Sequence, residues 1–157
     1  MRVLVALGSN LGDRLASLEA GLNVLAELGQ VTRSPMVMET PDESGTGPAY
    51  LNTVALLETD LELTRLLEEL LRREIRLGRR RDGIRNAPRP LDLDLIVAEG
   101  REGRWVWPSP PDLLCLGPEL SLELPHPRAR KRDFVLEPWR ALEGALPADL
   151  RLKDTFM

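Results

Sequence analysis

The sequence has little of several residue types on which common functional sites depend. Its 157 residues include one cysteine, one histidine and one tyrosine. Cys115 cannot form an internal disulfide, and no second thiol exists for a cysteine-based zinc site, so we expect a reducing compartment. Because Cys115 stands between leucines, it is predicted to be a small buried hydrophobic residue. Disulfide-stapled folds and cysteine-based zinc sites are therefore excluded.

Long apolar runs and an excess of positive charge are also missing. The apolar start at residues 1–7 ends at Gly8-Ser9-Asn10, which is too short for a membrane span and lacks a signal-peptide cleavage pattern. The net charge of −4 argues against a general nucleic-acid binder. We expect a single globular domain over residues 1–157, monomeric and cytoplasmic, with small-molecule partners and neither nucleic-acid nor membrane partners.

The hydrophobic pattern predicts short strands alternating with two longer helices. Strands are predicted at 2–7, 31–40, 50–58 and 91–98, and Ser34-Pro35 interrupts the second. Leucines recur at helical spacing over 15–28 and 62–77. The order βαββαβ indicates an α+β, ferredoxin-like core with an antiparallel sheet and both helices on one face. Beyond it we expect a short edge strand at 105–107, irregular chain over 108–125 and a helix at 134–142.

Two acidic side chains share one face of the last predicted core strand. Leucines alternate with Asp92 and Asp94, which places the carboxylates on the same face, roughly 7 Å apart at the backbone. Like charges this close are costly unless a cation lies between them, and Mg²⁺ accepts one or two carboxylates together with phosphate oxygens. Asp-Leu-Asp alone favours a solvated strand face. The basic segment before it favours a site for a metal-bound polyphosphate.

The basic segment combines a stiff approach to the strand with several arginines. Pro88 and Pro90 hold Arg89 in an extended conformation, and its guanidinium suits phosphate oxygens. A glycine-containing loop lies ahead of the carboxylates, and the arginines that flank it are placed to close over phosphates: Arg79, Arg81 and Arg85. Three further arginines are predicted to lie on a solvated helix face: Arg72, Arg73 and Arg76.

The stretch Arg85-x-Ala87-Pro88-Arg89-x-x-Asp92-Leu93-Asp94-Leu95-Ile96 resembles the characteristic motif of the 6-hydroxymethyl-7,8-dihydropterin pyrophosphokinases. These enzymes of folate synthesis transfer pyrophosphate from ATP to a pterin alcohol and release AMP. The resemblance covers about residues 2–142 and implies the same α+β core with a C-terminal extension. It also implies a Mg²⁺-dependent diphosphokinase that uses two Mg²⁺ ions as cofactors, with ATP as a co-substrate.

The resemblance assigns roles to individual residues. Asp92 and Asp94 would hold the metal, and Asp94 is also the candidate proton acceptor. Charge neutralisation during catalysis would come from Arg79, Arg81, Arg85 and Arg89. ATP binding is implied for Glu74, Arg89, His126 and Arg132. Pterin binding is implied for Gly8, Thr40, Pro41, Tyr50, Asn52 and Phe134, with the two rings stacking on opposite faces of the pterin and the Asn52 amide pairing with its polar edge.

Several of these residues also have structural interpretations. Gly8-Ser9-Asn10 is typical of a strand–turn–helix joint, and a tyrosine at a strand start or a lone histidine is more often structural. The chain also departs from the family where Asn86 replaces a lid tryptophan and where the loop 42–49 carries no apolar residue for the ring.

Two other classes of function stay open at this point. One is a ferredoxin-like RNA-binding module that uses the arginines, although aromatic pairs on the central strands and a net basic charge are missing. The other is a noncatalytic nucleotide sensor. Formation of AMP from ATP in the presence of the pterin alcohol separates the enzyme from both.

Overall fold

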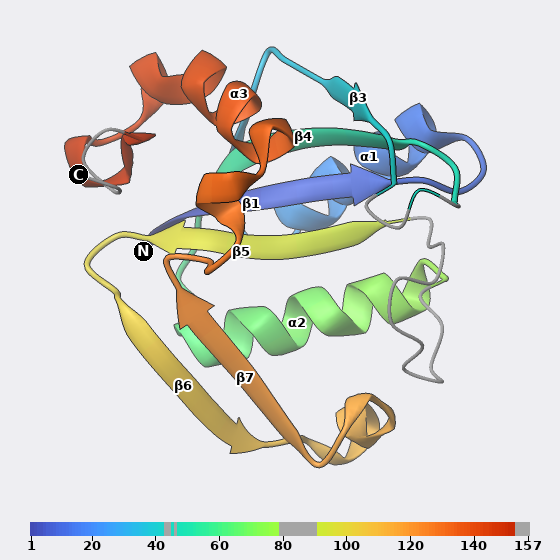
Figure 1. The fold of residues 1–157 in the computed structure, drawn as a ribbon. Coiled ribbons are helices and arrows are strands. Elements are labelled where there is room, and N and C mark those ends of the chain that lie inside the picture. The colour runs from blue at the N-terminus through green and yellow to red at the C-terminus, as the bar shows by residue number, and fades with distance from the viewer. Residues whose placement is uncertain (43–44, 46, 79–90, 153–157) are drawn as a thin grey trace.

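The structure, a computed structural model, describes residues 1–42, 45, 47–78 and 91–152. Its helices and strands are, in chain order, β1 (Arg2–Ser9), α1 (Arg14–Ala26), β2 (Gln30–Arg33), β3 (Met38–Thr40), β4 (Tyr50–Glu58), α2 (Leu63–Arg76), β5 (Asp92–Ala98), β6 (Gly103–Pro108), β7 (Glu119–Leu124) and α3 (Asp133–Leu142) (Figure 1). Short 3₁₀ turns fill the C-terminal half, among them η1 (Pro111–Leu116) and η2 (Ala129–Lys131).

The main sheet is antiparallel and has the strand order β2-β4-β1-β5, with β3 also paired to β4. This arrangement confirms the predicted α+β, ferredoxin-like core. The break at Ser34-Pro35 divides the second predicted strand into β2 and β3, which pair with successive parts of the same neighbour. The Ser34 hydroxyl holds the break in place, because it donates to the carbonyl of Pro138 in α3 at 2.7 Å.

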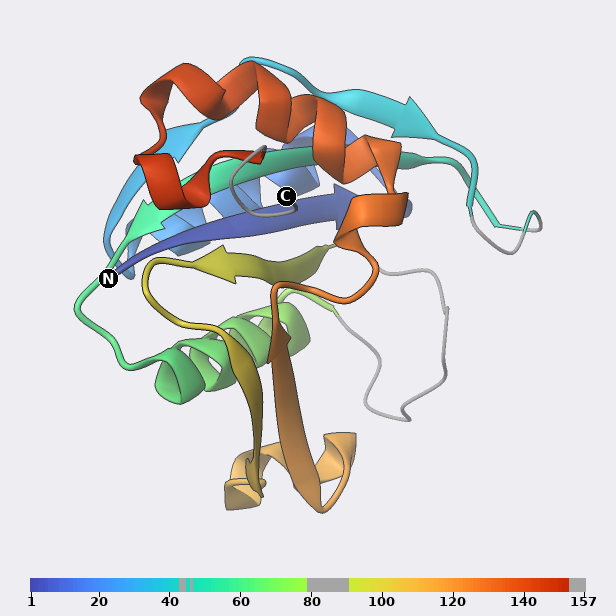
Figure 2. The same ribbon diagram turned by 60° about the vertical axis from the view of Figure 1, so that its left-hand side comes forward.

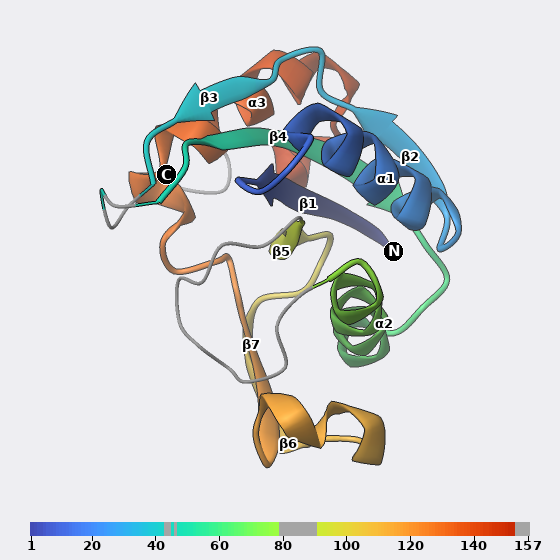
Figure 3. The same cartoon turned by 90° about the vertical axis from the view of Figure 1, so that its right-hand side faces the viewer.

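Two hydrophobic clusters fill the two faces of the sheet. On one face α1 and α2 pack against side chains that include Val3, Val5 and Leu57. On the other face α3 and the chain after it pack against Leu4, Val54 and Ile96. Figures 2 and 3 show α3 on the side of the sheet opposite α1 and α2. The sheet is therefore the shared middle layer of the molecule, as the alternation of side chains along β1 requires.

The region 108–125 is not irregular, so that prediction was wrong. It contains η1 and β7, and β7 pairs with β6 as a separate two-stranded antiparallel sheet. Leu120, Leu122 and Leu124 alternate with exposed residues along β7, and prolines on both sides obscured this strand pattern. Cys115 is exposed, contrary to prediction, because η1 turns Leu113 inward instead.

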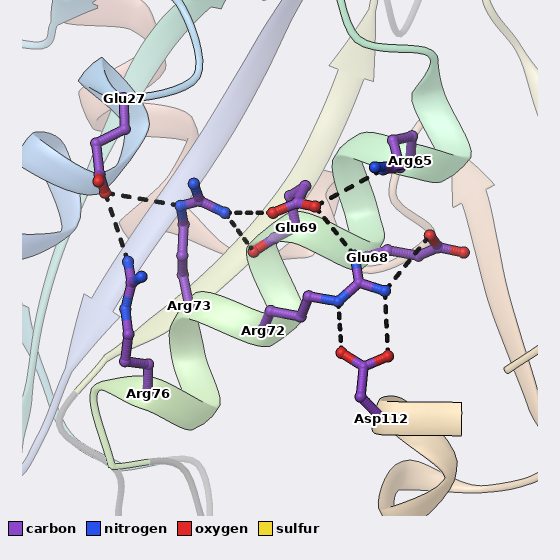
Figure 4. Close-up of polar contacts among 8 residues, drawn as sticks. All are labelled: Glu27, Arg65, Glu68, Glu69, Arg72, Arg73, Arg76 and Asp112. Carbon is purple, nitrogen blue, oxygen red and sulfur yellow. Dashed lines mark hydrogen bonds and ion pairs between the residues drawn. The ribbon is translucent and has the colours of Figure 1, made fainter. Parts of the chain in front are cut away.

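Polar contacts fasten this hairpin to α2. The Arg72 guanidinium forms two hydrogen bonds to the Asp112 carboxylate, at 2.7 and 3.2 Å (Figure 4). The Trp107 indole N–H donates to Glu68 at 3.0 Å. Arg73 bridges Glu69 of α2 and Glu27 of the α1 C-terminus. Arg72 and Arg73 therefore lie in an ion-pair network rather than on the predicted solvated face.

None of the helices in the described part of the chain has the length and apolar character that a membrane crossing requires.

Candidate active site

The strand register brings three predicted site residues into one row across the sheet. Gly8 of β1 lies between Asn52 of β4 and Asp92 of β5, and Asp94 lies opposite Ala6. Directly opposed residues of antiparallel strands project to the same face. Their side chains therefore rise from the face that α3 covers, at the end of the sheet where α3 begins.

A cavity of about 100 Å³ opens over this row. Of the predicted site residues, those that line it are Gly8, Thr40, Tyr50, Asn52, Asp92, Asp94, Arg132 and Phe134. They come from β1, β3, β4, β5 and the start of α3, segments far apart in the sequence. The fold thus gathers candidate pterin, metal and phosphate contacts into one cavity.

The absence of a side chain at Gly8 leaves room for the neighbouring groups. A Cβ placed on Gly8 would lie 3.0 Å from Asn52 Oδ1 and 3.5 Å from Tyr50 Cδ1. The buried Asn52 amide is oriented by its Nδ2, which donates to Thr40 Oγ1 at 3.0 Å. An oriented amide offers one donor and one acceptor direction, which suits the edge of a heterocycle.

Aromatic side chains from two different elements line the cavity. Tyr50 comes from the start of β4, and Phe134 comes from the first turn of α3. The Arg132 guanidinium carbon lies 5.5 Å from the centre of the Phe134 ring, so the cation rests over the ring face. This contact fixes a positive charge at the rim of the cavity beside an aromatic wall.

His126 is not among the residues that line the cavity, but its charge interacts with Arg132 and Asp92, which are, and β5 holds its backbone. Its backbone N–H donates to the Ile96 carbonyl at 2.8 Å, and its Nδ1 accepts the Arg128 backbone N–H at 3.1 Å. Burial and the nearby Arg132 and Arg128 lower the pKa of His126 below 6.5, against an opposing effect of Asp92. The neutral ring therefore carries its proton on Nε2, which makes Nε2 a donor suited to a phosphate oxygen.

Asp42 also lines the cavity, although the sequence analysis assigned it no role. Its Oδ2 accepts the Gly47 backbone N–H at 2.9 Å, which ties the ends of the turn after β3 together. The residue follows Thr40-Pro41 directly, and that proximity was the only available signal. The cavity thus has a third carboxylate, on the side of Thr40 and Tyr50 rather than of β5.

The remaining predicted site residues do not line the cavity or lie outside the described residues. Pro41 is exposed and is not part of the lining. Glu74 is 1% exposed and its Oε1 accepts the Leu93 backbone N–H at 2.6 Å. The predicted catalytic arginines lie outside the described residues: Arg79, Arg81, Arg85 and Arg89.

The carboxylates of Asp92 and Asp94 fit a hard divalent cation. Both are half-buried, project to one strand face and line one cavity. Within the part of the chain that the structure describes, no group of three or more acidic, histidine or cysteine side chains forms a closed metal cage. Two carboxylates suit Mg²⁺ in particular, because it usually keeps water and substrate phosphate oxygens in its coordination shell.

The fold and the cavity together define a ferredoxin-like α+β domain in which two carboxylates, Asp92 and Asp94, line the same cavity as two aromatic rings, Tyr50 and Phe134. Comparison with known proteins narrows the class. The profile of the 7,8-dihydro-6-hydroxymethylpterin-pyrophosphokinase family matches residues 4–144. The chain belongs to this family.

Individual relatives agree with that assignment. The chain is 36% identical to the 2-amino-4-hydroxy-6-hydroxymethyldihydropteridine pyrophosphokinase of Pseudomonas aeruginosa, over 98% of this chain and 85% of the relative. It is also 36% identical to the enzyme of the same name from Mycobacterium leprae, over 91% and 72%. A mitochondrial folate synthesis bifunctional protein of Pisum sativum is 36% identical over 90% of this chain, which spans only 25% of that longer protein.

Proposed function

We propose that this protein transfers pyrophosphate from ATP to 6-hydroxymethyl-7,8-dihydropterin, giving the pterin diphosphate and AMP. One observation carries the proposal: Tyr50 and Phe134 line the same cavity as Asp92 and Asp94. A flat heterocycle and a metal-bound polyphosphate could therefore meet there. Family membership supports the same activity.

The pterin would occupy the part of the cavity between β3, β4 and α3. Its two faces would contact the rings of Tyr50 and Phe134, which supply apolar area and favourable ring stacking. The Asn52 amide, oriented by Thr40, would pair with the polar edge of the ring. Gly8 would let the ring approach the sheet closely, since a side chain there would press on Asn52.

The triphosphate would lie on the β5 side of the cavity. Asp92 and Asp94 would hold two Mg²⁺ ions, which when bound neutralise phosphate charge and orient the transferred group. The Arg132 guanidinium and the Nε2–H of His126 would contact phosphate oxygens. The arginines outside the described residues would add to this neutralisation, as the resemblance predicts.

In the reaction, the pterin hydroxymethyl oxygen attacks the β-phosphorus of ATP. The bond from that phosphorus to the bridging oxygen of the α-phosphate breaks, and AMP leaves with the bond electrons. The hydroxyl proton passes to the Asp94 carboxylate. Phosphoryl transfer depends mainly on positioning and charge neutralisation, so most of the rate enhancement would come from how the cavity holds both substrates.

Action as a monomer stays a prediction of the sequence. A cytoplasmic location stays a prediction of the sequence.

The test is AMP release from ATP and MgCl₂ with and without the pterin alcohol, followed by chromatography. AMP should form only when pterin and Mg²⁺ are both present. Asp94→Asn should lower the rate by about 10²–10³-fold while the circular dichroism spectrum stays unchanged. Asp112→Asn, an exposed aspartate on η1, is the control and should keep the full rate. Near-normal turnover in both Asp92→Asn and Asp94→Asn would refute the site.

A further inference from the structure

Glu74 is a buried carboxylate at an unusual place on α2. The buried side chains of this helix are Leu63, Leu66, Leu70 and Glu74, so the glutamate takes the last position of the apolar stripe. Only 1% of it is exposed. Removing a carboxylate from water is costly unless hydrogen bonds compensate, so its hydrogen bond with β5 is important to understand.

That contact covers an open edge of the sheet. Among the described strands, β5 is the last of the main sheet, with β1 on its other side. Leu93 is buried, and its N–H donates to Glu74 Oε1 at 2.6 Å. A buried N–H without a partner would cost about 1–3 kcal/mol. Glu74 therefore provides the hydrogen-bond acceptor that a backbone carbonyl of a neighbouring strand would provide at a paired edge.

The position of this hydrogen bond along β5 matters for the site. Leu93 lies between Asp92 and Asp94, and its N–H belongs to the peptide unit that joins it to Asp92. Because a peptide unit is planar, holding its N–H also fixes the direction of the chain through Asp92. Three residues later, the Ile96 carbonyl accepts the His126 N–H at 2.8 Å. The outer edge of the segment that carries both carboxylates is thus held at two points.

We infer that Glu74 is a positioning residue, which holds the peptide of Leu93 so that the carboxylates of Asp92 and Asp94 present the geometry of a divalent-cation site. This role rests on the proposed function for the cation site, and it differs from direct contact with ATP because Glu74 does not line the cavity. It needs the acceptor oxygen of the side chain rather than its negative charge.

Two variants separate the acceptor from the charge. Glu74→Gln keeps an oxygen acceptor and removes the charge, whereas Glu74→Met keeps a similar length and removes the acceptor. Leu70→Ala is the matched control, because Leu70 is fully buried one turn earlier in the same stripe and its side chain cannot accept a hydrogen bond. It reports what a loss of stability alone does to the site.

The first measurement is amide hydrogen exchange in the metal-free protein, followed by NMR. Glu74→Met should lose protection at Leu93 selectively, relative to amides of the central strand β4. Glu74→Gln should retain that protection, and Leu70→Ala should lower protection evenly across the sheet. An unchanged Leu93 in Glu74→Met would overturn the inference.

The second measurement is the affinity for Mn²⁺ in the presence of a non-hydrolysable ATP analogue, followed by electron paramagnetic resonance. Glu74→Met should bind Mn²⁺ about 10-fold more weakly, as when partners behind a metal ligand are lost, while Glu74→Gln and Leu70→Ala should stay within about twofold. Equal losses in Glu74→Gln and Glu74→Met would overturn the inference in favour of the charge. If the unaltered protein bound no Mn²⁺, the proposed function would fail, and amide exchange would still decide whether Glu74 holds β5.

Discussion

At the scale of single residues, His126 shows how its surroundings set the chemistry of a side chain. Its Nδ1 is committed to the Arg128 backbone N–H, and both burial and neighbouring arginines disfavour the protonated ring. A neutral ring with its proton on Nε2 is therefore the form present near pH 7. This state depends on η2 and β5, which hold the histidine from both sides.

This environment predicts a pH dependence of stability. The pKa of His126 is lowered below 6.5 in the folded protein, so the unfolded chain takes up the proton first as the pH falls. The contribution of His126 to the free energy of unfolding should be complete above about pH 6.5 and should be lost as the pH falls toward the folded-state pKa. An NMR titration of the ring should give the lowered value directly.

The control for this prediction is His126→Asn, whose side-chain oxygen can accept the Arg128 N–H but does not titrate. Urea unfolding at pH 7.5 and 5.5 should show a larger loss of stability in the unaltered protein than in the variant. A ring pKa above 6.5, or equal losses in the two proteins, would contradict the description of this histidine.

At the scale of elements, Gly29 lies in the turn between α1 and β2 and packs directly against the backbone at the end of β4. A Cβ on Gly29 would lie 1.9 Å from the carbonyl oxygen of Glu58, the last residue of β4. Glu58 pairs with Gln30 at the start of β2, so β4 cannot move away from Gly29 without breaking its pairing with β2. The close packing of these two chain segments therefore requires glycine at this joint.

We predict that Gly29→Ala lowers the free energy of unfolding by about 3 kcal/mol, near the upper end of typical overpacking costs. Two other glycines separate the possible causes. Gly12 has φ +68° and open space around it, so Gly12→Ala should cost only about 1 kcal/mol of backbone strain. Gly144 has neither constraint, and Gly144→Ala should stay within about 0.5 kcal/mol. Urea unfolding measures all three, and similar losses for Gly29→Ala and Gly144→Ala would refute the steric explanation.

At the scale of the whole molecule, one sheet supplies both hydrophobic clusters. Successive residues of β1 belong to different clusters, Leu4 to the α3 side and Val5 to the α1 and α2 side. The chain after α3 completes the second cluster, because Leu150 is buried and its carbonyl accepts the Trp139 indole N–H at 2.9 Å. Loss of either cluster should therefore expose one face of the sheet, and the other cluster packs on the opposite face of that same sheet.

We predict a single cooperative unfolding transition, as expected for one domain. Leu66→Ala in α2 and Leu150→Ala in the chain after α3 should each lower the midpoint of that same transition. Each should lower the free energy of unfolding by about 2–5 kcal/mol. Circular dichroism and tryptophan fluorescence should give coincident curves. Leu114→Ala at an exposed position is the control and should have little effect. Two separable transitions, each shifted by only one variant, would contradict a single domain.

The sequence by itself determined the elements of the core and the chemistry of β5. Periodicity is local, so the leucine stripes of α1 and α2 and the alternation of leucine with Asp92 and Asp94 could be recognised without knowing any neighbour. The motif at 85–96 likewise indicated the family, although its arginines lie outside the described residues. The strand β7 shows where local patterns were insufficient, because its alternation was hidden between prolines.

Only the tertiary structure decided which side chains meet. Gly8, Asn52 and Asp92 share a row because three strands pair in one register, and strand register is a non-local property. The same holds for Asp42 at the cavity and for Glu74 behind β5, since each acquires its partners through the packing of distant segments. Local spacing specifies a helix or a strand, whereas a site requires contacts between residues that the chain itself keeps far apart.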